Sequence, residues 1–345
     1  MRGPVTAGGP ATPAHHSGPE PAVSQFFTLA GRTLALTSGD SALVQEVESL
    51  LGPPLPAAAG AVALTAFVTG GADGFAHLQL RMADPAHLVP SDLLLAAGTP
   101  DFPFDLVEAA GARAVFSRRG GTTPALLVDG GDVRLVMAEG WRKALSLLLL
   151  QRLMRSRADA IFFHAASVAL RGRGLLLVGP KGAGKSTLAL ALSARGHALL
   201  GDENACYLPA SHQVLPFRRP VGIKPGPRSA AVEDRLRALG RRPERDGMMR
   251  LPADAVAAAF DERAVPLGAV VFLDGFAPVT RLHVLEPGRA DVGRLQAVGA
   301  SMVNAPHTQR AFEMTRLLAR CAVYTMTAGA PDAAAATLEE GVFAA

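Results

Sequence analysis

The chain has 345 residues, of which 49% are hydrophobic and 19% are charged, so it is long enough to bury one large core or two ordinary ones. Its net charge of +4 is spread along the sequence and only 5% of its residues are aromatic, which argues against nucleic acid as a partner. The strongest apolar run, residues 147–150, is far too short to span a membrane. The two cysteines, Cys206 and Cys321, lie far apart in no metal-binding pattern and fit a reducing compartment. We therefore expect a cytoplasmic protein without nucleic-acid or membrane partners.

Residues 1–23 are rich in Pro, Gly and Ala and have no apolar stretch of the kind found in signal peptides, so we expect a disordered tail. Residues 24–138 are expected to form an α+β domain with a largely antiparallel sheet. Its one clear helix is predicted at residues 41–51, capped by Asp40 or Ser41 and ended by Gly52. Residues 85–103 are rich in loop-forming residues. The expected strands are a hairpin within residues 26–36 and residues 61–68, 75–82, 113–117, 125–128 and 133–137.

Residues 139–160 are expected to link this domain to the rest of the chain, and residues 141–158 within them predict an amphipathic helix. Its basic side chains are expected to lie mostly on the solvent-exposed side. They are Arg142, Lys143, Arg152, Arg155 and Arg157.

A strand, a glycine-rich loop and a helix follow one another in residues 175–194. The apolar run at 175–178 predicts a buried strand, residues 179–186 (GPKGAGKS) match the P-loop pattern G-x-x-x-x-G-K-[ST], and residues 187–194 predict a helix. Gly182 and Gly184 permit a positive φ and a close approach to a phosphate. The loop amides and the helix N-terminus would present positive partial charge to that phosphate.

Side chains of the loop add to this site. Lys185 is expected to reach the β- and γ-phosphates, and the Ser186 hydroxyl is expected to bind Mg²⁺. Lys181 either adds charge near the γ-phosphate or lies exposed. The expected nucleotide-binding residues are Gly179, Pro180, Lys181, Gly182, Ala183, Gly184, Lys185, Ser186 and Thr187.

The rest of the chain, within an expected domain of residues 161–345, alternates predicted strands and helices. Residues 198–201 predict a strand that ends in Asp202 and Glu203, and residues 268–274 predict a buried strand. Ligands of such α/β layers bind at the carboxyl ends of the strands, so we expect Asp202 beside the phosphates. The other expected elements are a basic turn leading into an extended piece at residues 217–224, a strand at 279–284 next to the 268–274 strand, a strand at 322–326, and helices at 231–239, 308–320 and 331–340.

The stretch from His164 to Glu203 resembles the catalytic core of bacterial HPr kinase/phosphorylase and its HPr-kinase-like relatives. In that family a histidine precedes a G-x-G strand, here with Gly172 and Gly174, and the P-loop and an R-G-H strand ending in two acids follow. Residues 219–223 also look like the family's R-G-x-G-I element. About forty residues carry the resemblance strongly.

This resemblance implies an α/β P-loop kinase domain that uses ATP and Mg²⁺ to phosphorylate a Ser or Thr hydroxyl of a peptide or small protein, such as the precursor peptides of lasso-peptide pathways. Asp202 would accept the proton of the attacking hydroxyl, and Glu203 would hold Mg²⁺ directly or through water. His164 would pair with Asp202 or lie satisfied near the sheet end. Arg219, with Arg218 as a further candidate, would stabilise charge on the transferring phosphoryl group.

The sequence also departs from the family pattern. Glu203 stands where the family usually has Asp, and Phe217 stands where an acid precedes the Arg element. Residues 287–289 match a late P-G-R motif at three positions only. We therefore expect kinase activity without efficient phosphate-driven reversal.

Two other functions fit the same chain. Residues 270–274 (VVFLD) match the pattern by which many P-loop NTPases hold Mg²⁺ through a Walker-B aspartate, here Asp274. The protein would then be a hydrolase or a nucleotide-gated switch, and a noncatalytic nucleotide-binding scaffold is the third alternative. Arg241, Arg242 and Arg245 either dock an acidic substrate or form solvated surface. The acceptor, the preference for ATP over GTP and the formation of a homo-oligomer stay open.

Overall fold

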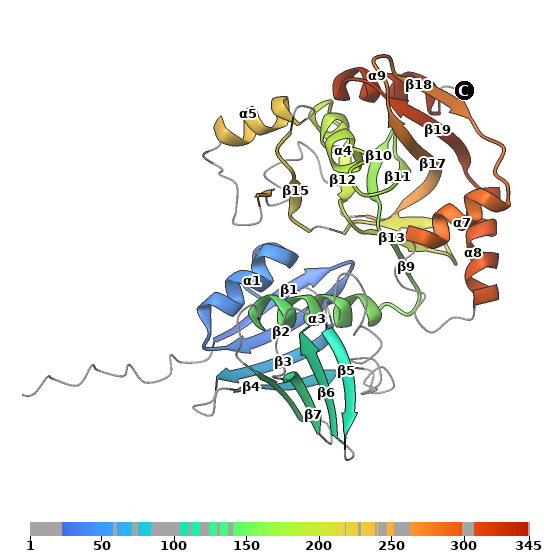
Figure 1. The fold of residues 1–345 in the computed structure, drawn as a ribbon. Coiled ribbons are helices and arrows are strands. Elements are labelled where there is room, and N and C mark those ends of the chain that lie inside the picture. Colours follow the sequence, from blue (N-terminus) through green and yellow to red (C-terminus); the bar gives the residue numbers. More distant parts are fainter. Residues whose placement is uncertain are drawn as a thin grey trace, which may run out of the picture.

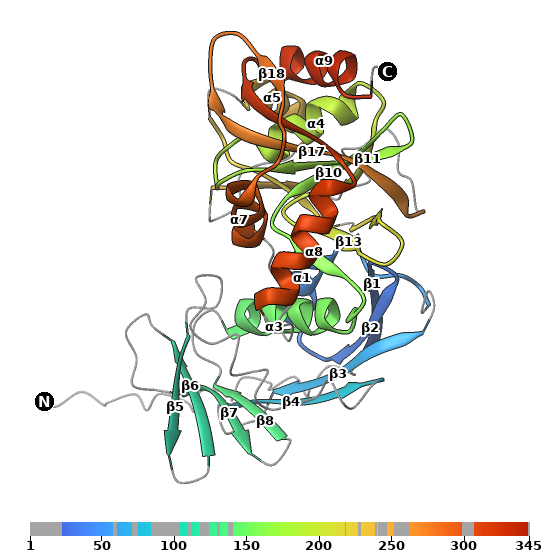
Figure 2. The same cartoon turned by 90° about the vertical axis from the view of Figure 1, so that its right-hand side faces the viewer.

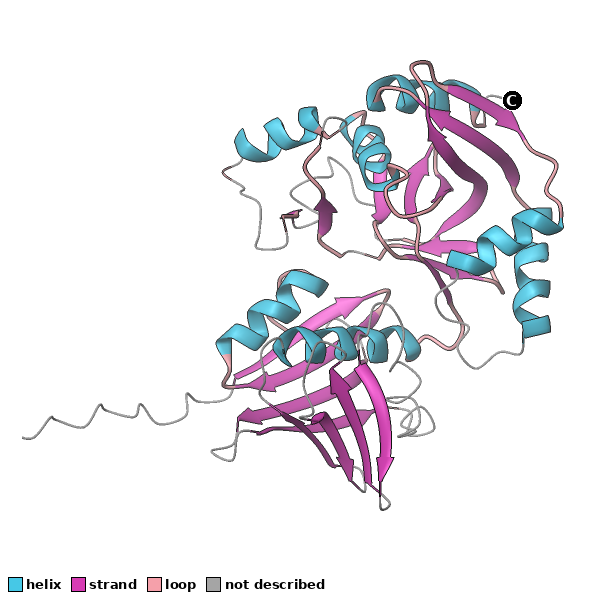
Figure 3. Ribbon diagram, in the orientation of Figure 1, coloured by secondary structure: helices cyan, strands magenta, loops and turns pink. Residues whose placement is uncertain are grey.

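The computed structural model describes residues 23–57, 61–70, 75–83, 104–109, 112–117, 124–129, 132–136, 141–217, 219–226, 229–238, 240, 247–251, 263–298 and 307–343. Over these ranges the chain forms a mixed α/β structure with sheets of eight, nine and two strands (Figures 1 and 3). The expected tail, apart from Val23, and the loop-rich residues 85–103 lie outside the described residues. In the described part, no helix combines the length and the apolar character needed to cross a membrane.

The eight-stranded sheet has the order β1-β2-β3-β4-β8-β7-β6-β5. All neighbours are antiparallel except β2 and β3, which are parallel, so the predicted antiparallel character is confirmed. Strand β5 was not predicted. The strands are β1 Val23–Leu29, β2 Arg32–Ser38, β3 Val62–Gly70, β4 Phe75–Met82, β5 Phe104–Ala109, β6 Ala112–Ser117, β7 Pro124–Asp129 and β8 Asp132–Val136.

Helix α1 (Ser41–Leu51) makes the crossover between the parallel strands β2 and β3. A carboxylate oxygen of Asp40 accepts a hydrogen bond from the Leu43 amide at 2.9 Å, which caps the first turn. At the other end Gly52 has φ 86°, a conformation that favours glycine and ends the helix. The predicted helix and both of its end signals are confirmed.

Helix α3 (Trp141–Arg155) packs beside α1, and its Leu145 and Leu149 join the core that α1 forms with the eight-stranded sheet. The prediction that its basic residues lie mostly in solvent is wrong, because Arg152 is only 2% exposed and the side chain of Arg157, which lies beyond the end of the helix, is only 13% exposed. Lys143 is the exposed residue of the set. Arg142 is partly exposed and pairs with Asp40, the residue that caps α1. The helix is thereby fixed to α1 by both apolar packing and an ion pair.

The nine-stranded sheet contains the predicted strand before the glycine-rich loop. Strands β11, β17 and β19 run parallel side by side. The sequence predicts a place for β18 next to β17, but β18 pairs with β19 instead. Its strands are β9 Ile161–Phe163, β10 Ala166–Leu170, β11 Arg173–Val178, β12 Ala198–Gly201, β13 Ala205–Leu208, β14 Gln213–Leu215, β17 Val265–Phe276, β18 Arg281–Val284 and β19 Ala322–Ala328, and a separate two-stranded sheet pairs β15 Val221–Ile223 with β16 Met249–Leu251.

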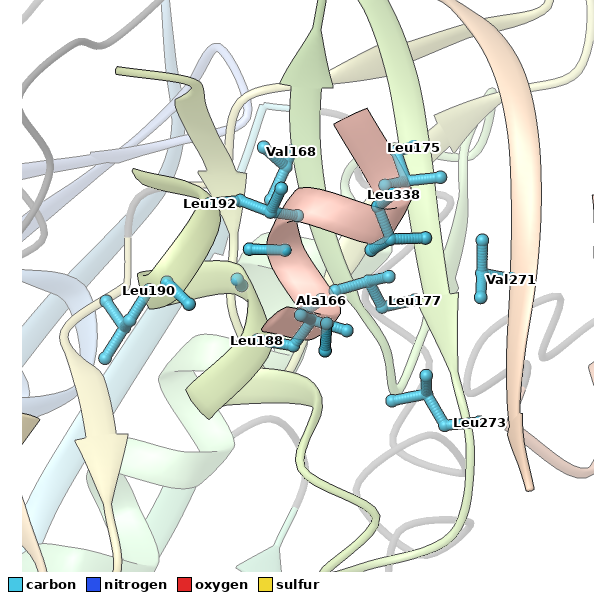
Figure 4. Packing of buried hydrophobic residues seen from close by; sticks show 14 of the residues in the cluster. Ala166, Val168, Leu175, Leu177, Leu188, Leu190, Leu192, Val271, Leu273 and Leu338 are labelled. Atoms are coloured by element: carbon cyan, nitrogen blue, oxygen red, sulfur yellow. The ribbon is translucent and has the colours of Figure 1, made fainter. Parts of the chain in front are cut away.

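Helices cover both faces of this sheet (Figures 1 and 2). On one face α4 (Lys185–Ala194) and α9 (Pro331–Gly341) bury an apolar cluster in which Leu188, Leu192 and Leu338 lie near Val168 and Leu175 (Figure 4). On the other face α7 (Arg289–Val298) and α8 (His307–Ala319) form a second cluster. Helix α5 (Ala230–Ala238) follows β15 in the chain. The predicted helices at 231–239, 308–320 and 331–340 are confirmed close to their expected bounds.

Candidate phosphate-binding site

The glycine-rich loop connects the end of β11 to the start of α4, in the order that the sequence predicts. Gly182 and Gly184 have φ angles of 86° and 89°, in the left-handed region that favours glycine. Gly179 lets the loop pack closely, because a Cβ there would lie 3.0 Å from the Ala183 Cβ and 3.2 Å from the Leu273 Cβ and would push these neighbours apart. The loop therefore folds tightly over the sheet edge and brings its backbone to the N-terminus of α4, where amides without helical partners favour an anion.

Lys185 is the first residue of α4 and its side chain is buried under the loop, with 7% exposure. Its Nζ donates hydrogen bonds to the Gly179 carbonyl at 2.8 Å and to the Pro180 carbonyl at 3.1 Å. Burial lowers the pKa of Lys185, and the negative charges of Asp202 and Glu203 act in the opposite direction. The ammonium group thus holds the loop closed as well as supplying charge. Lys181, in contrast, is exposed at the top of the loop.

The Ser186 hydroxyl donates a hydrogen bond to Oδ1 of Asp202 at 2.8 Å. Strands β11 and β12 are both antiparallel to β10 and so run in the same direction, which brings Asp202, just after β12, to the edge where the loop lies. Asp202 is 2% exposed, and its Oδ2 has no hydrogen-bond partner. Asp202 therefore lies beside the start of α4, as the sequence predicts, and one of its two buried oxygens has no hydrogen-bond partner.

Burial raises the pKa of Asp202 to about 6, because the ionised carboxylate loses its hydration. The hydrogen bond from Ser186 acts against this, and so does the charge of Arg219, while the neighbouring Glu203 raises the pKa further. A carboxylate in this environment changes its charge close to neutral pH, as a proton acceptor should.

Glu203 and Arg219 lie at the rim of the site. Glu203 has a positive φ of 59° and a partly exposed side chain, and its Oε2 is 3.6 Å from a guanidinium nitrogen of Arg219. The Nε of Arg219 donates to the carbonyl of Leu50 in the last turn of α1 at 3.1 Å. Arg219 thus connects α1, which packs on the eight-stranded sheet, to Glu203 next to Asp202. A contact of Arg219 with a phosphoryl group stays a prediction, and Arg218 lies outside the described residues, as do Arg241, Arg242 and Arg245.

His164 has an exposed side chain, and its backbone N–H donates to the carbonyl of Val298 at 2.6 Å. Because Oδ2 of Asp202 has no hydrogen-bond partner, His164 does not bond to that oxygen. His197 of the R-G-H segment bonds through Nε2 to Oε1 of Glu339 on α9 at 2.7 Å. This histidine thereby connects the end of α4 to α9 and has a structural role away from the glycine-rich loop.

Asp274, the alternative metal ligand, lies on β17 beside the loop strand, since Val178 of β11 pairs with Phe272 of β17. Its carboxylate pairs with the guanidinium of Arg294 on α7, which also stacks 4.1 Å above the Phe272 ring. Arg294 received no role from the sequence. Its pairing with Asp274 could not be predicted from the sequence, because the pairing depends on α7 folding back onto β17.

Of the residues 287–289 that match P-G-R, the first two precede α7 and Arg289 is its first residue. The Gly288 amide donates to Oδ2 of Asp291 at 3.0 Å, which caps the helix. This segment therefore has a structural role of its own.

No protein-family model matches the chain, and no curated protein matches it either. Among solved structures, the chain is similar to the HPr(Ser) kinase/phosphatase from Coxiella burnetii. The two share 19% identity over 36% of this chain and 77% of that chain, with a TM-score of 0.21.

The donor atoms at the loop fit magnesium and a nucleotide phosphate. Mg²⁺ prefers oxygen ligands and takes one or two carboxylates together with phosphate oxygens. Ser186 offers a hydroxyl oxygen and Glu203 offers a partly exposed carboxylate, while Asp202 accepts the hydrogen bond of the Ser186 hydroxyl. Within the described ranges, no group of three or more His, Cys, Asp and Glu residues forms a metal site made by the protein alone.

Proposed function

We propose that this protein is an ATP- and Mg²⁺-dependent kinase that transfers a phosphoryl group to a Ser or Thr hydroxyl of a peptide or small protein. The observation that carries the proposal is the hydrogen bond between Ser186 and Asp202 at the start of α4. It joins the hydroxyl expected to bind Mg²⁺ to a buried carboxylate that has one oxygen free to accept a proton.

The loop would hold the phosphates through its backbone amides and the N-terminus of α4. Lys185 would supply positive charge from beneath the loop, and Ser186 and Glu203 would hold the metal. Bound ATP would supply the γ-phosphoryl group, with ADP as the leaving group, and bound Mg²⁺ would neutralise negative charge on the phosphate oxygens. Residues of the chain then have to orient the acceptor and remove its proton.

Asp202 would be the proton acceptor. The Ser186 bond to Oδ1 fixes the orientation of the carboxylate, so Oδ2 is the oxygen available to an incoming hydroxyl. With a pKa of about 6, Asp202 is ionised at neutral pH and still basic enough to take a proton. Most of the catalytic effect would come from positioning and electrostatics, because the phosphoryl group passes through a loose transition state.

The choice of a hydroxyl on a peptide or small protein follows from the resemblance of residues 164–203 to the HPr-kinase-like family. Precursor peptides of the lasso type belong to this acceptor class. The P-G-R match is confined to the capped start of α7, and we expect little dephosphorylation driven by inorganic phosphate.

The alternative, a hydrolase or nucleotide-gated switch built on Asp274, is favoured by one observation: Asp274 lies on the strand next to β11. Its carboxylate, however, is already paired with Arg294, whereas Asp202 is the carboxylate bonded to Ser186. We therefore rank the kinase first.

Mass spectrometry tests the proposal. The protein would be incubated with MgATP and the peptides encoded beside its gene, with a second sample that lacks ATP. We expect a gain of one phosphate on a hydroxyl residue of a peptide. ATP consumption with all peptides unmodified would contradict the proposal.

A further inference from the structure

Strand β17 contains an irregularity where it passes the phosphate loop. Leu273 pairs with Met326 of β19, and the next pair is Phe276 with Ala328. Three steps along β17 thus match two along β19, which defines a β-bulge at residues 274–275. Gly275 has φ 109°, a backbone conformation that residues with a side chain rarely adopt.

The bulge changes the face on which Phe276 lies. Along β17, Phe272 belongs to the apolar cluster under α7 and α8, and Leu273 belongs to the cluster under α4 and α9 (Figure 4). Asp274 follows the same alternation, because it pairs with Arg294 on α7. An uninterrupted strand would turn Phe276 toward α7 as well, since alternate residues share a face. The extra residue turns it to the opposite face.

On that face the Phe276 ring lies against the last glycine of the loop. A Cβ placed on Gly184 would be 3.2 Å from Cε1 and 3.4 Å from Cζ of the ring. Phe276 is nevertheless 41% exposed as a residue. An aromatic ring that is partly in solvent and lies against the N-cap glycine of α4 is therefore adjacent to the place where phosphates would bind.

We propose that Phe276 is the platform on which the nucleobase of the bound nucleotide stacks. This inference rests on the proposed function, because it takes the phosphates to lie at the loop. A base is joined to its phosphates through one ribose, so a base partner has to lie close to the loop. Bulges next to active sites commonly re-aim a side chain toward the ligand. Because every base has a π-face, the platform would accept adenine and guanine alike.

The test compares a nucleotide with a phosphate chain that has no base. Calorimetry would measure the binding of MgATP, MgGTP and magnesium tripolyphosphate to the wild-type protein, to Phe276→Ala and to Phe276→Tyr. Phe312→Ala is the control, because Phe312 on α8 is also an exposed aromatic residue, at 64%.

We expect Phe276→Ala to weaken both nucleotides by about 5- to 150-fold, the range of one base–aromatic stack, and to leave tripolyphosphate unchanged. Phe276→Tyr and Phe312→Ala should bind like the wild type. The platform is refuted if Phe276→Ala binds MgATP like the wild type or loses tripolyphosphate by the same factor. If the wild-type protein binds neither MgATP nor tripolyphosphate, the proposed function itself fails and the platform fails with it.

Discussion

Replacing Asp202 with Asn removes the proton acceptor and keeps the size of the side chain. The amide still fits beside Ser186, whose oxygen can accept a hydrogen bond in place of donating one. Loss of a general base lowers a rate by about 10²- to 10⁴-fold. We expect phosphotransfer to fall by this factor while the affinity for MgATP changes little.

The raised pKa of Asp202 gives this prediction a pH dependence. With a pKa of about 6, the carboxylate is roughly 90% ionised at pH 7 and roughly 10% ionised at pH 5. Phosphotransfer by the wild-type protein should therefore be about tenfold slower at pH 5 than at pH 7. The residual activity of Asp202→Asn should lack this step.

The same shift predicts the effect on stability. The pKa rises from 3.8 in the unfolded chain to about 6 in the folded one, so the folded state holds this proton more tightly. The bound proton stabilises the folded state fully below the unfolded pKa of 3.8, and this stabilisation is lost as the pH rises through the folded pKa of about 6. The ionised carboxylate then costs up to about 3 kcal/mol. Asp202→Asn should be strongly impaired in phosphotransfer at pH 7 yet at least as stable as the wild type in urea unfolding.

Asp274→Asn is the matched variant. Both variants would be assayed at the same magnesium concentration for acceptor phosphorylation and for ATP hydrolysis, after their folding is checked. We expect Asp202→Asn to lose phosphotransfer activity and Asp274→Asn to retain it. An inactive Asp274→Asn beside an active Asp202→Asn would refute the reasoning and favour the hydrolase.

Three further predictions concern other residues of the described part. Lys185→Ala should abolish MgATP binding in a calorimetric titration, because the buried ammonium group holds the loop. Lys181→Ala, in the exposed part of the loop, should weaken binding little. Equal affinities of the two variants for MgATP would count against the loop assignment. Arg219→Gln removes a positive charge that lowers the pKa of Asp202, so the acid limb of the pH–rate profile should move to higher pH, and an unmoved limb would contradict this. Glu339→Gln should lower the free energy of unfolding by about 1 kcal/mol at pH 7, since Arg195 and His197 hold its carboxylate and lower its pKa. That difference should shrink as the pH falls below the unfolded value of 4.5, and a difference that stays constant would argue against the ion pair.

The local elements were predictable because their signals are short in sequence. Asp40 and Gly52 mark both ends of α1, and the glycine-rich loop identifies the turn between β11 and α4. The position of Asp202 was also predictable, since it depends only on β12 running in the direction of β11.

The features that the sequence did not reveal depend on contacts between distant segments. Arg152 looks like a surface residue by its chemistry, and its burial follows from the way α3 packs beside α1. The pairing of Asp274 with Arg294 requires α7 to fold back against β17. Nothing in the composition of β17 shows that a bulge turns Phe276 toward Gly184. The domain boundaries expected at residues 23, 138 and 160 stay predictions.

The fate of the γ-phosphate tests the central claim most directly. Phosphorus NMR would follow MgATP with the wild-type protein, once with the acceptor peptides and once without them, and would count the phosphate that appears as phosphoester and as inorganic phosphate. We expect phosphoester to account for most of the ATP consumed when the acceptor is present, and we expect ATP consumption nearly to stop without the acceptor. Inorganic phosphate equal to the ATP consumed in both samples would contradict the kinase and identify a hydrolase.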